Sequence, residues 1–250
     1  MNHHDRARVR DRYRHSRTGT MSTPVERRSW TRHIYYRSSR TRTTWKFRLA
    51  VAAVILFAGW LTRAPLTAAI ASSLVCTANA ASSDAIVVEN FEADNYLVFE
   101  RAGELRRAGL SPRVLVPVSA SSSLQPNAVA LGTARLVADL ARVGDVEIVP
   151  IREVEPISLN AAGDVRRYVE QHGLRSIILV SPSLRSKRSA SVYEAVFARS
   201  GIRVTCEPVH GGDGVETWTE TWHGIQNVAE QWSKWQYYRF YVLPFYGSES

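Results

Sequence analysis

The sequence predicts an α/β fold: a Rossmann-like parallel sheet of about five strands with helices on both faces, preceded by one transmembrane helix. Two observations predict this fold. Short β-branched runs alternate with helix-length segments from residue 84 to residue 208, which is typical of a parallel sheet covered on both faces. A charge-free apolar run lies upstream of them, between basic residues.

The predicted elements alternate regularly along the chain. Each strand is a short run rich in valine, isoleucine and leucine, and the segments between such runs are long enough for helices. Ligands of such sheets bind at the carboxyl ends of the strands, which gives the place of a candidate site. Strands are expected at 84–88, 113–116, 146–151, 176–180 and 202–206, and helices at 99–108, 128–142, 161–172 and 192–199.

An aromatic-rich helix is expected at the C-terminal end, over residues 217–241. Trp218, Trp222 and Ile225 fall at helical spacing within it. We expect this helix to pack against the sheet. A lid over the crevice and an aromatic contact with the membrane interface are the alternatives.

Charge is divided unevenly along the chain. The formal net charge is +9, but residues 1–46 hold 13 lysines and arginines against three acids, a net of +10. The rest of the chain therefore carries −1 and lacks the basic surface of a nucleic-acid binder, so we expect no nucleic-acid partner. The basic segment is poor in aliphatic residues and is expected to be a disordered arm that anionic lipid attracts. Translation starting at Met21 instead of Met1 is an alternative.

The apolar run after the arm predicts a membrane anchor. Residues 49–61 contain no charged or strongly polar group. Because flanking side chains can extend toward the interfaces, residues 47–63 are expected to span the lipid bilayer as a short helix. Arg63 then lies at the far border of the bilayer, and Pro65 is expected to break the helix.

The position of the arm predicts the orientation. A basic N-terminal segment stays cytoplasmic, so residues 1–46 form a cytoplasmic arm. Residues 64–83 are expected to link the anchor to an α/β domain at 84–246, outside the cytoplasm. The protein is then a single-pass protein of the inner (plasma) membrane with a periplasmic domain. A cleaved signal peptide is the alternative, because Ala78-Asn79-Ala80 resembles an A-x-A cleavage site.

The sequence contains two cysteines, Cys76 and Cys206. We expect Cys206 to be a buried thiol on the last strand, and a disulfide with Cys76 is the alternative in an oxidising compartment. The sequence has no C-x-x-C motif and no cluster of cysteine and histidine, so we expect no metal site. It also lacks the Walker loop, the G-x-G-x-x-G fingerprint and the G-x-S-x-G elbow, so the cofactor is left unknown.

Five segments carry a family resemblance. They are the D-A-I-V-V strand at 84–88, the R-A-G-E-L helix and its turn at 101–113, the E-P-I-S-L-N segment at 155–160, the Ser-rich basic segment at 181–189 and the aromatic tail at 218–238. In this order they resemble the YdcF/SanA/ElyC family (domain of unknown function 218). The resemblance implies a role in cell-envelope maintenance and one N-terminal anchor helix, and some members are proposed to bind nucleotide-like ligands such as S-adenosylmethionine.

The family's site motifs are altered in this chain. Glu89-Asn90-Phe91 occupies the place of a glycine turn, and Arg185 occupies the place of a loop histidine. A glycine turn lets a ligand approach the backbone closely, so its replacement affects binding. The scaffold motifs are kept while the site motifs differ, which suggests either a changed ligand or a catalytically silent domain.

Several residues remain candidates for the site. Glu153 and Glu155 follow the third strand and could serve in acid/base chemistry or contact a ribose. Ser158 is expected to cap the following helix, and a helix N-terminus also attracts anions. The segment 181–189 is interpreted as a cationic loop that cradles a phosphate or carboxylate. The expected ligand-binding residues are Glu89, Asn90, Ser158, Asn160, Ser181, Ser183, Arg185 and Arg188, and the candidate catalytic residues are Glu155, Arg185 and Arg188.

Three functions are compatible with these residues. The first is a membrane-anchored envelope protein that binds a nucleotide-like or phosphorylated small molecule at the strand ends. The second is a non-catalytic interaction module that kept the fold and lost the site. The third is a hydrolase or transferase that acts on a phosphorylated or lipid-linked envelope precursor.

Overall fold

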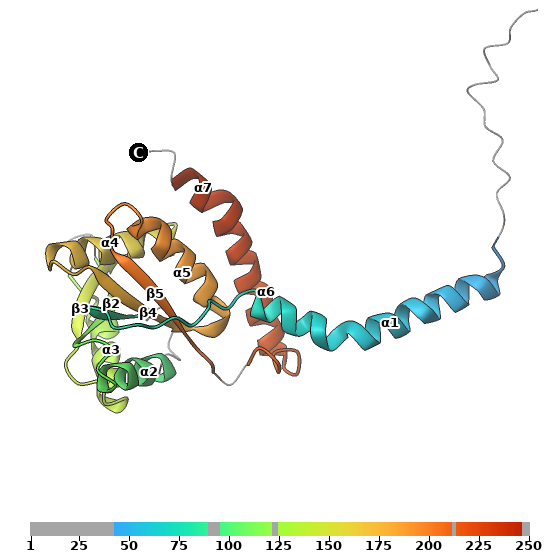
Figure 1. Ribbon diagram of the computed structural model, residues 1–250, viewed down its shortest axis with the longest axis horizontal. Coiled ribbons are helices and arrows are strands. Elements are labelled where there is room, and N and C mark those ends of the chain that lie inside the picture. The colour runs from blue at the N-terminus through green and yellow to red at the C-terminus, as the bar shows by residue number, and fades with distance from the viewer. Residues whose placement is uncertain (1–42, 90–95, 122–124, 212–213, 247–250) are drawn as a thin grey trace, which may run out of the picture. The chain divides into compact units, whose positions relative to one another are not determined.

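The computed structural model describes residues 43–89, 96–121, 125–211 and 214–246 of the 250-residue chain. The chain divides into two compact units, Met1–Ala52 and Ala53–Ser250. In the first unit, the described residues hold the start of the first helix. The second unit contains the rest of that helix and the α/β fold (Figure 1). The elements are α1 (Trp45–Ser72), β1 (Ala85–Val88), α2 (Tyr96–Arg107), β2 (Arg113–Ala120), α3 (Ala128–Leu140), β3 (Glu147–Arg152), α4 (Ile157–Gln171), β4 (Ser176–Pro182), α5 (Ser183–Phe197), β5 (Arg203–Val209), α6 (Trp222–Tyr237), the π-helix η2 (Tyr238–Val242) and α7 (Leu243–Tyr246).

The five strands form one parallel sheet in the order β3-β2-β1-β4-β5. The central strand β1 pairs on both sides, so that Val87 lies opposite Leu115 of β2 and Leu179 of β4. The predicted Rossmann-like fold is therefore confirmed. The strand order reverses between β1 and β4, and such a reversal opens a crevice at the carboxyl ends of the two strands.

Each face of the sheet has its own hydrophobic core. Because side chains alternate across a strand, Ala85 and Val87 pack on one face, while Ile86 and Val88 pack on the other. The first face is covered by α4 and α5, and the second by α2 and α3, as Figure 1 shows. Burial on both faces explains why the central strands are uninterrupted apolar runs.

Helix α1 is longer than the predicted anchor. It continues through Pro65 to Ser72, so the break expected at Pro65 is wrong, and residues 64–72 are helical rather than part of a linker. Proline in a helix interior costs about 3 kcal/mol, which tertiary packing of the following turns can offset. That packing is present, because Ala71 is fully buried in a cluster with Leu74, Trp218 and other apolar residues.

The segment after α1, residues 73–80, is bonded to the α/β domain. Cys76 forms a disulfide with Cys206 of β5, so the free thiol that we favoured is wrong and the alternative is correct. Local sequence patterns could not predict this pairing, because the two cysteines are 130 residues apart and meet only in the folded chain. Next to the disulfide, the Asn79 N–H donates to the Cys206 carbonyl at 3.0 Å, and the Cys206 N–H donates to Asn79 Oδ1 at 2.7 Å.

The aromatic C-terminal helix is present but shifted relative to the predicted 217–241. Helix α6 begins at Trp222, after Thr221, whose side chain accepts a hydrogen bond from the Gly224 N–H at 2.9 Å. This is the usual way in which threonine caps a helix. The chain then continues through η2 and α7 to Tyr246.

Candidate functional site

A buried polar cluster lies at the carboxyl ends of β1 and β4, where the strand order reverses. Its centre is Glu89, which follows β1 and whose carboxylate is only 1% exposed. The Ser189 hydroxyl donates to Glu89 Oε1 at 2.7 Å, and the Ser181 hydroxyl donates to Oε2. Arg185 Nε lies 3.3 Å from Glu89 Oε1 as a buried ion pair. Glu89 therefore receives two hydroxyl donors and one guanidinium.

The sequence suggested that the segment 181–189 is a loop, and this is wrong. The segment forms the end of β4 and the first turns of α5. β4 runs to Pro182, and α5 begins at Ser183, nine residues before the predicted start. Serine has only modest helix propensity, and a polar segment rich in serine resembles a loop even though its arginines and lysine are good helix formers. Here the helix forms because its buried face packs on the sheet, as Tyr193 and Phe197 show.

A cavity of about 370 Å³ opens beside this cluster. All three candidate catalytic residues, Glu155, Arg185 and Arg188, line it together with Ser158. Arg185 belongs to both the Glu89 cluster and the cavity, because its side chain pairs with Glu89 and also lines the cavity. The complete lining is Glu153, Glu155, Ile157, Ser158, Arg185, Arg188, Lys234, Tyr237 and Tyr238.

The C-terminal helices supply a wall of the cavity that sequence reasoning missed. Arg188 Nη2 donates to Gln231 Oε1 at 3.2 Å, and its guanidinium lies 5.6 Å from the centre of the Tyr238 ring. Lys234 pairs with Glu230. These residues come from α6 and η2, more than 40 positions after Arg188 in the sequence, and only the alternative of a lid over the crevice pointed to them.

Ser158 does not cap α4. Pro156 occupies the capping position without a side-chain hydrogen bond, and Ser158 lies within the first turn of the helix. The Ser158 N–H instead donates to the Tyr238 hydroxyl at 3.2 Å. This bond joins the start of α4 to η2 at the wall of the cavity, which both residues line.

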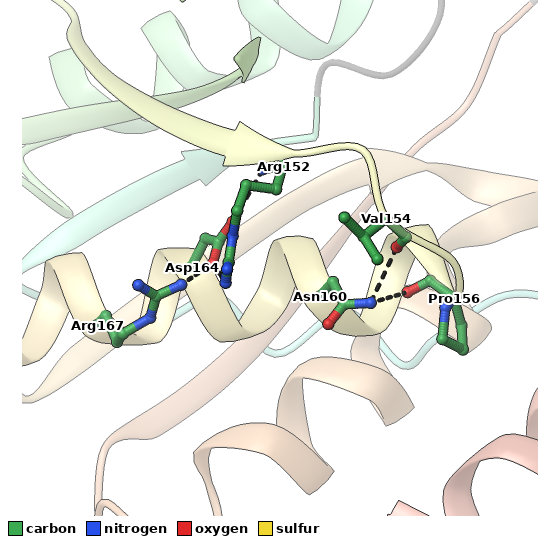
Figure 2. Close-up of polar contacts among 6 residues, drawn as sticks. All are labelled: Arg152, Val154, Pro156, Asn160, Asp164 and Arg167. Atoms are coloured by element: carbon green, nitrogen blue, oxygen red, sulfur yellow. Dashed lines mark hydrogen bonds and ion pairs between the residues drawn. The ribbon is translucent and has the colours of Figure 1, made fainter. Parts of the chain in front are cut away.

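Asn160 holds the β3–α4 loop rather than lining the cavity. Its amide Nδ2 donates to the Val154 carbonyl at 2.9 Å and to the Pro156 carbonyl at 3.4 Å, as Figure 2 shows. These two bonds fix the turn of backbone that carries Glu155. Asn160, predicted to bind ligand, therefore acts as a positioning residue in this structure.

A second clamp holds the other end of the same loop (Figure 2). Buried Asp164 accepts from the Arg152 N–H at 2.9 Å and from Arg152 Nη2 at 2.8 Å, and it also pairs with Arg167. Burial raises the pKa of Asp164, but the hydrogen bonds from Arg152 and the two positive charges outweigh burial and hold this pKa below its ordinary value. Both ends of the loop that presents Glu153 and Glu155 are thus fixed.

The remaining predicted site residues do not line the cavity. Ser181 is part of the Glu89 cluster. Ser183 is buried, and its carbonyl accepts from the Ser186 hydroxyl at 2.7 Å. Asn90 lies outside the described residues. Of the eight predicted ligand-binding residues, the structure brings Ser158, Arg185 and Arg188 to the cavity.

Tyr193 was not expected near the site. Burial and the charge of Glu89 raise the pKa of its hydroxyl, so this group stays protonated. Among the residues that the structure describes, the hydroxyl has no hydrogen-bond partner. Within the described part of the chain, the Tyr193 hydroxyl is therefore an unsatisfied hydrogen-bond donor in the core near Glu89.

No protein-family model matches this chain, and a search of curated proteins finds no match.

Proposed function

We propose that this chain is a membrane-anchored envelope protein that binds an anionic, nucleotide-like or phosphorylated small molecule in the cavity beside α5. A role in cell-envelope maintenance is part of the proposal, because the five sequence segments resemble the YdcF/SanA/ElyC family.

The observation that carries the binding proposal is the pair of buried arginines at the cavity. Arg185 and Arg188 are 7% and 6% exposed, and both belong to α5 at the crevice between β1 and β4. Arginine presents a planar fork of donors that matches phosphate and carboxylate oxygens. A volume of about 370 Å³ is in the range of small-molecule sites.

The membrane half of the proposal is supported by helix α1 and the disulfide. α1 has 28 residues and is long and apolar enough to cross a membrane. The twelve arginines before it favour a cytoplasmic N-terminus. The Cys76–Cys206 disulfide is consistent with an oxidising compartment for the domain. We therefore propose a single-pass inner-membrane protein with the α/β domain on the periplasmic side.

Ligand binding can be tested by thermal shift on the full chain in detergent. The panel contains nucleotides, S-adenosylmethionine, sugar phosphates and lipid-carrier phosphates. A ligand at 100 times its Kd adds about 2.7 kcal/mol of stability, or roughly 5–11 °C in Tm for a protein of this size.

Two variants locate the binding. Arg188→Gln should abolish the shift, whereas Lys187→Gln should keep it. Lys187 is a matched control, because it is a neighbouring cation of α5 that is exposed and does not line the cavity. A shift that both variants keep would place the ligand elsewhere and contradict the proposal.

Glu155 offers the test for an enzymatic version of the same site. Its exposed carboxylate lines the cavity with the two arginines and is placed to act as an acid or base on a phosphorylated envelope precursor. Glu155→Gln should then preserve ligand binding but fail to rescue a deletion phenotype. Full rescue by a variant that accumulates normally would exclude catalysis through Glu155.

A second candidate function is a non-catalytic interaction module. The observation that favours it is that the cations of the cavity already have partners within the protein. Glu89 pairs with Arg185, Gln231 accepts from Arg188, and Glu230 pairs with Lys234. No thermal shift across the whole panel would favour this function over ligand binding.

A further inference from the structure

Helix α6 carries an apolar stripe on its outer surface. Trp222 is 71% exposed, Ile225 is 38% exposed and Trp232 is 47% exposed. With Ala229 between them, these residues recur at helical spacing and share one side of the helix. We name them the α6 stripe. It contains no charged residue, and it is distinct from the buried side, where Val228 and Gln231 lie.

The turn that precedes α6 is bonded to the last turns of α1. The Trp218 indole N–H donates to the Thr67 carbonyl at 3.1 Å. Trp218 and Val228 also share a buried apolar cluster with Ala71 and Leu74, which lie at and just after the end of α1. The stripe therefore belongs to a helix that shares this cluster with the end of the anchor helix and follows a turn bonded to it.

The length of α1 places this contact at the level of the lipid headgroups. With a rise of about 1.5 Å per residue, the helix is about 42 Å long, whereas the hydrocarbon core is about 30 Å thick. If Arg63 marks the border of the core, Thr67 lies about 6 Å beyond it along the helix. The headgroup region extends roughly 5–8 Å on each side of the core.

We propose that the α6 stripe is an interfacial membrane-contact surface that lies against the same bilayer that α1 spans. Tryptophan has an apolar ring body and one polar N–H, which suits the boundary between headgroups and acyl chains. An uncharged apolar stripe on a helix that is otherwise polar outside is the usual form of an interfacial helix. The inference rests on the membrane anchoring proposed above.

Such a contact would determine the orientation of the candidate site. Gln231 and Lys234 of α6 lie at the cavity side of the same helix, where Gln231 accepts from Arg188 and Lys234 lines the cavity. A helix held against the membrane on one side and against the cavity on the other fixes the distance of the site from the bilayer. The domain then sits as a rigid body on the membrane instead of swinging on its anchor.

The test is spin-label accessibility on the full chain in vesicles of phosphatidylcholine and phosphatidylglycerol. Single cysteines replace Trp222, Ile225 or Trp232, and the native disulfide leaves no other thiol to label. Matched controls replace His223 and Glu230, which are exposed on the same helix but away from the stripe. Using three separate positions keeps the test valid if one variant fails to fold.

Labels on the α6 stripe should collide with membrane-dissolved oxygen and be several-fold less accessible to a water-soluble nickel chelate than the control labels. Equal access of the nickel chelate to stripe and control positions would overturn the inference. Protection from both reagents, with dipolar broadening between copies, would also overturn it and would assign the stripe to self-association.

A label at Leu56 of α1 separates this inference from the proposed anchoring. Leu56 lies in the middle of the apolar run and is 74% exposed in the protein alone. If the Leu56 label is in the bilayer and the stripe labels are in water, only the interfacial contact fails. If the Leu56 label is itself in water, the membrane anchoring fails and the inference fails with it.

Discussion

Replacing Glu89 by glutamine should strongly destabilise the domain. The substitution keeps the shape of the side chain but removes its charge from a site that is only 1% exposed. Arg185, whose side chain is 8% exposed, then loses its carboxylate partner in a place that water reaches poorly. The hydroxyls of Ser181 and Ser189 also lose a charged acceptor.

The expected magnitude follows from the burial of the pair. Removing one partner of a buried ion pair costs about 3–5 kcal/mol, because the remaining charge loses a strong favourable interaction in a place that water solvates poorly. For a domain of this size, each 1 kcal/mol lowers Tm by roughly 2–4 °C, so Glu89→Gln should lower Tm by at least about 6 °C. Glu153→Gln is the matched control. It removes an exposed carboxylate of the same cavity and should change stability by less than about 0.5 kcal/mol.

The assay is equilibrium unfolding of the full chain in detergent with the disulfide intact. Glu89→Gln, Arg185→Met and the double variant complete a double-mutant cycle. The double variant should be more stable than the sum of the single effects predicts, with a coupling of at least about 1 kcal/mol. Additive effects within about 0.5 kcal/mol, or a Glu89→Gln variant as stable as the control, would refute the buried pair as the centre of the site.

Three further outcomes are expected from other parts of the fold. Serine in place of Cys76 and Cys206 removes a link between residues 130 positions apart, and unfolding under non-reducing conditions should show a loss of about 2–5 kcal/mol; an unchanged midpoint would contradict the disulfide. Because the pKa of Asp164 is lowered in the folded state, its ionised carboxylate stabilises the fold fully above about pH 4, and this stabilisation is lost as the pH falls through the folded-state pKa. Asp164→Asn should therefore lose less stability in acid than the wild type. Identical stability profiles in acid would contradict the lowered pKa. Gly224→Ala should destabilise by about 1–3 kcal/mol, because its Cβ would lie 2.3 Å from a backbone oxygen, whereas Gly132→Ala, with open space around it, should stabilise by about 0.5–1 kcal/mol; thermal unfolding of the two variants checks both signs.

The sheet could be predicted because its strands are buried on both faces. Burial on both sides demands continuous apolar runs, and such runs as Ile86-Val87-Val88 and Ile177-Ile178-Leu179 are visible without any tertiary information. The spacing between runs then determines the crossover helices. The observed strand order, which was not predicted from the sequence, is the common doubly wound one, and in such sheets a ligand site is expected at the crevice between β1 and β4.

The errors have tertiary causes. Pro65 is a helix breaker by local propensity, but the turns after it contact the α/β domain: Ala71 is buried, and the Thr67 carbonyl accepts a hydrogen bond from Trp218, more than 150 residues away. Arg185 resembles a loop residue by its polar neighbours, yet it sits in a helix that packs on the sheet. The disulfide and the Lys234 wall of the cavity both depend on segments that meet only after folding.

The candidate site could be predicted from the sequence only in part, because tertiary contacts again determine the roles of its residues. Polar residues that end strands could be identified, so Glu89 and Ser181 were singled out, but their role depends on what faces them. Glu89 proved to be the counterion of Arg185 instead of a wall of the cavity. Asn160 proved to hold backbone carbonyls. Sequence position indicated at which end of the sheet a site is expected, whereas tertiary contacts determine which of these residues line the cavity.

The measurement that tests the central claim most directly is hydrogen exchange of the full chain with and without the anion that gives the largest thermal shift. If the anion binds in the cavity, exchange should slow at residues 153–158 and 183–189 and at 231–238, which together supply its walls. The Arg188→Gln variant should lose this protection. Protection confined to other segments, or protection that persists in Arg188→Gln, would contradict a ligand site at the carboxyl ends of β1 and β4.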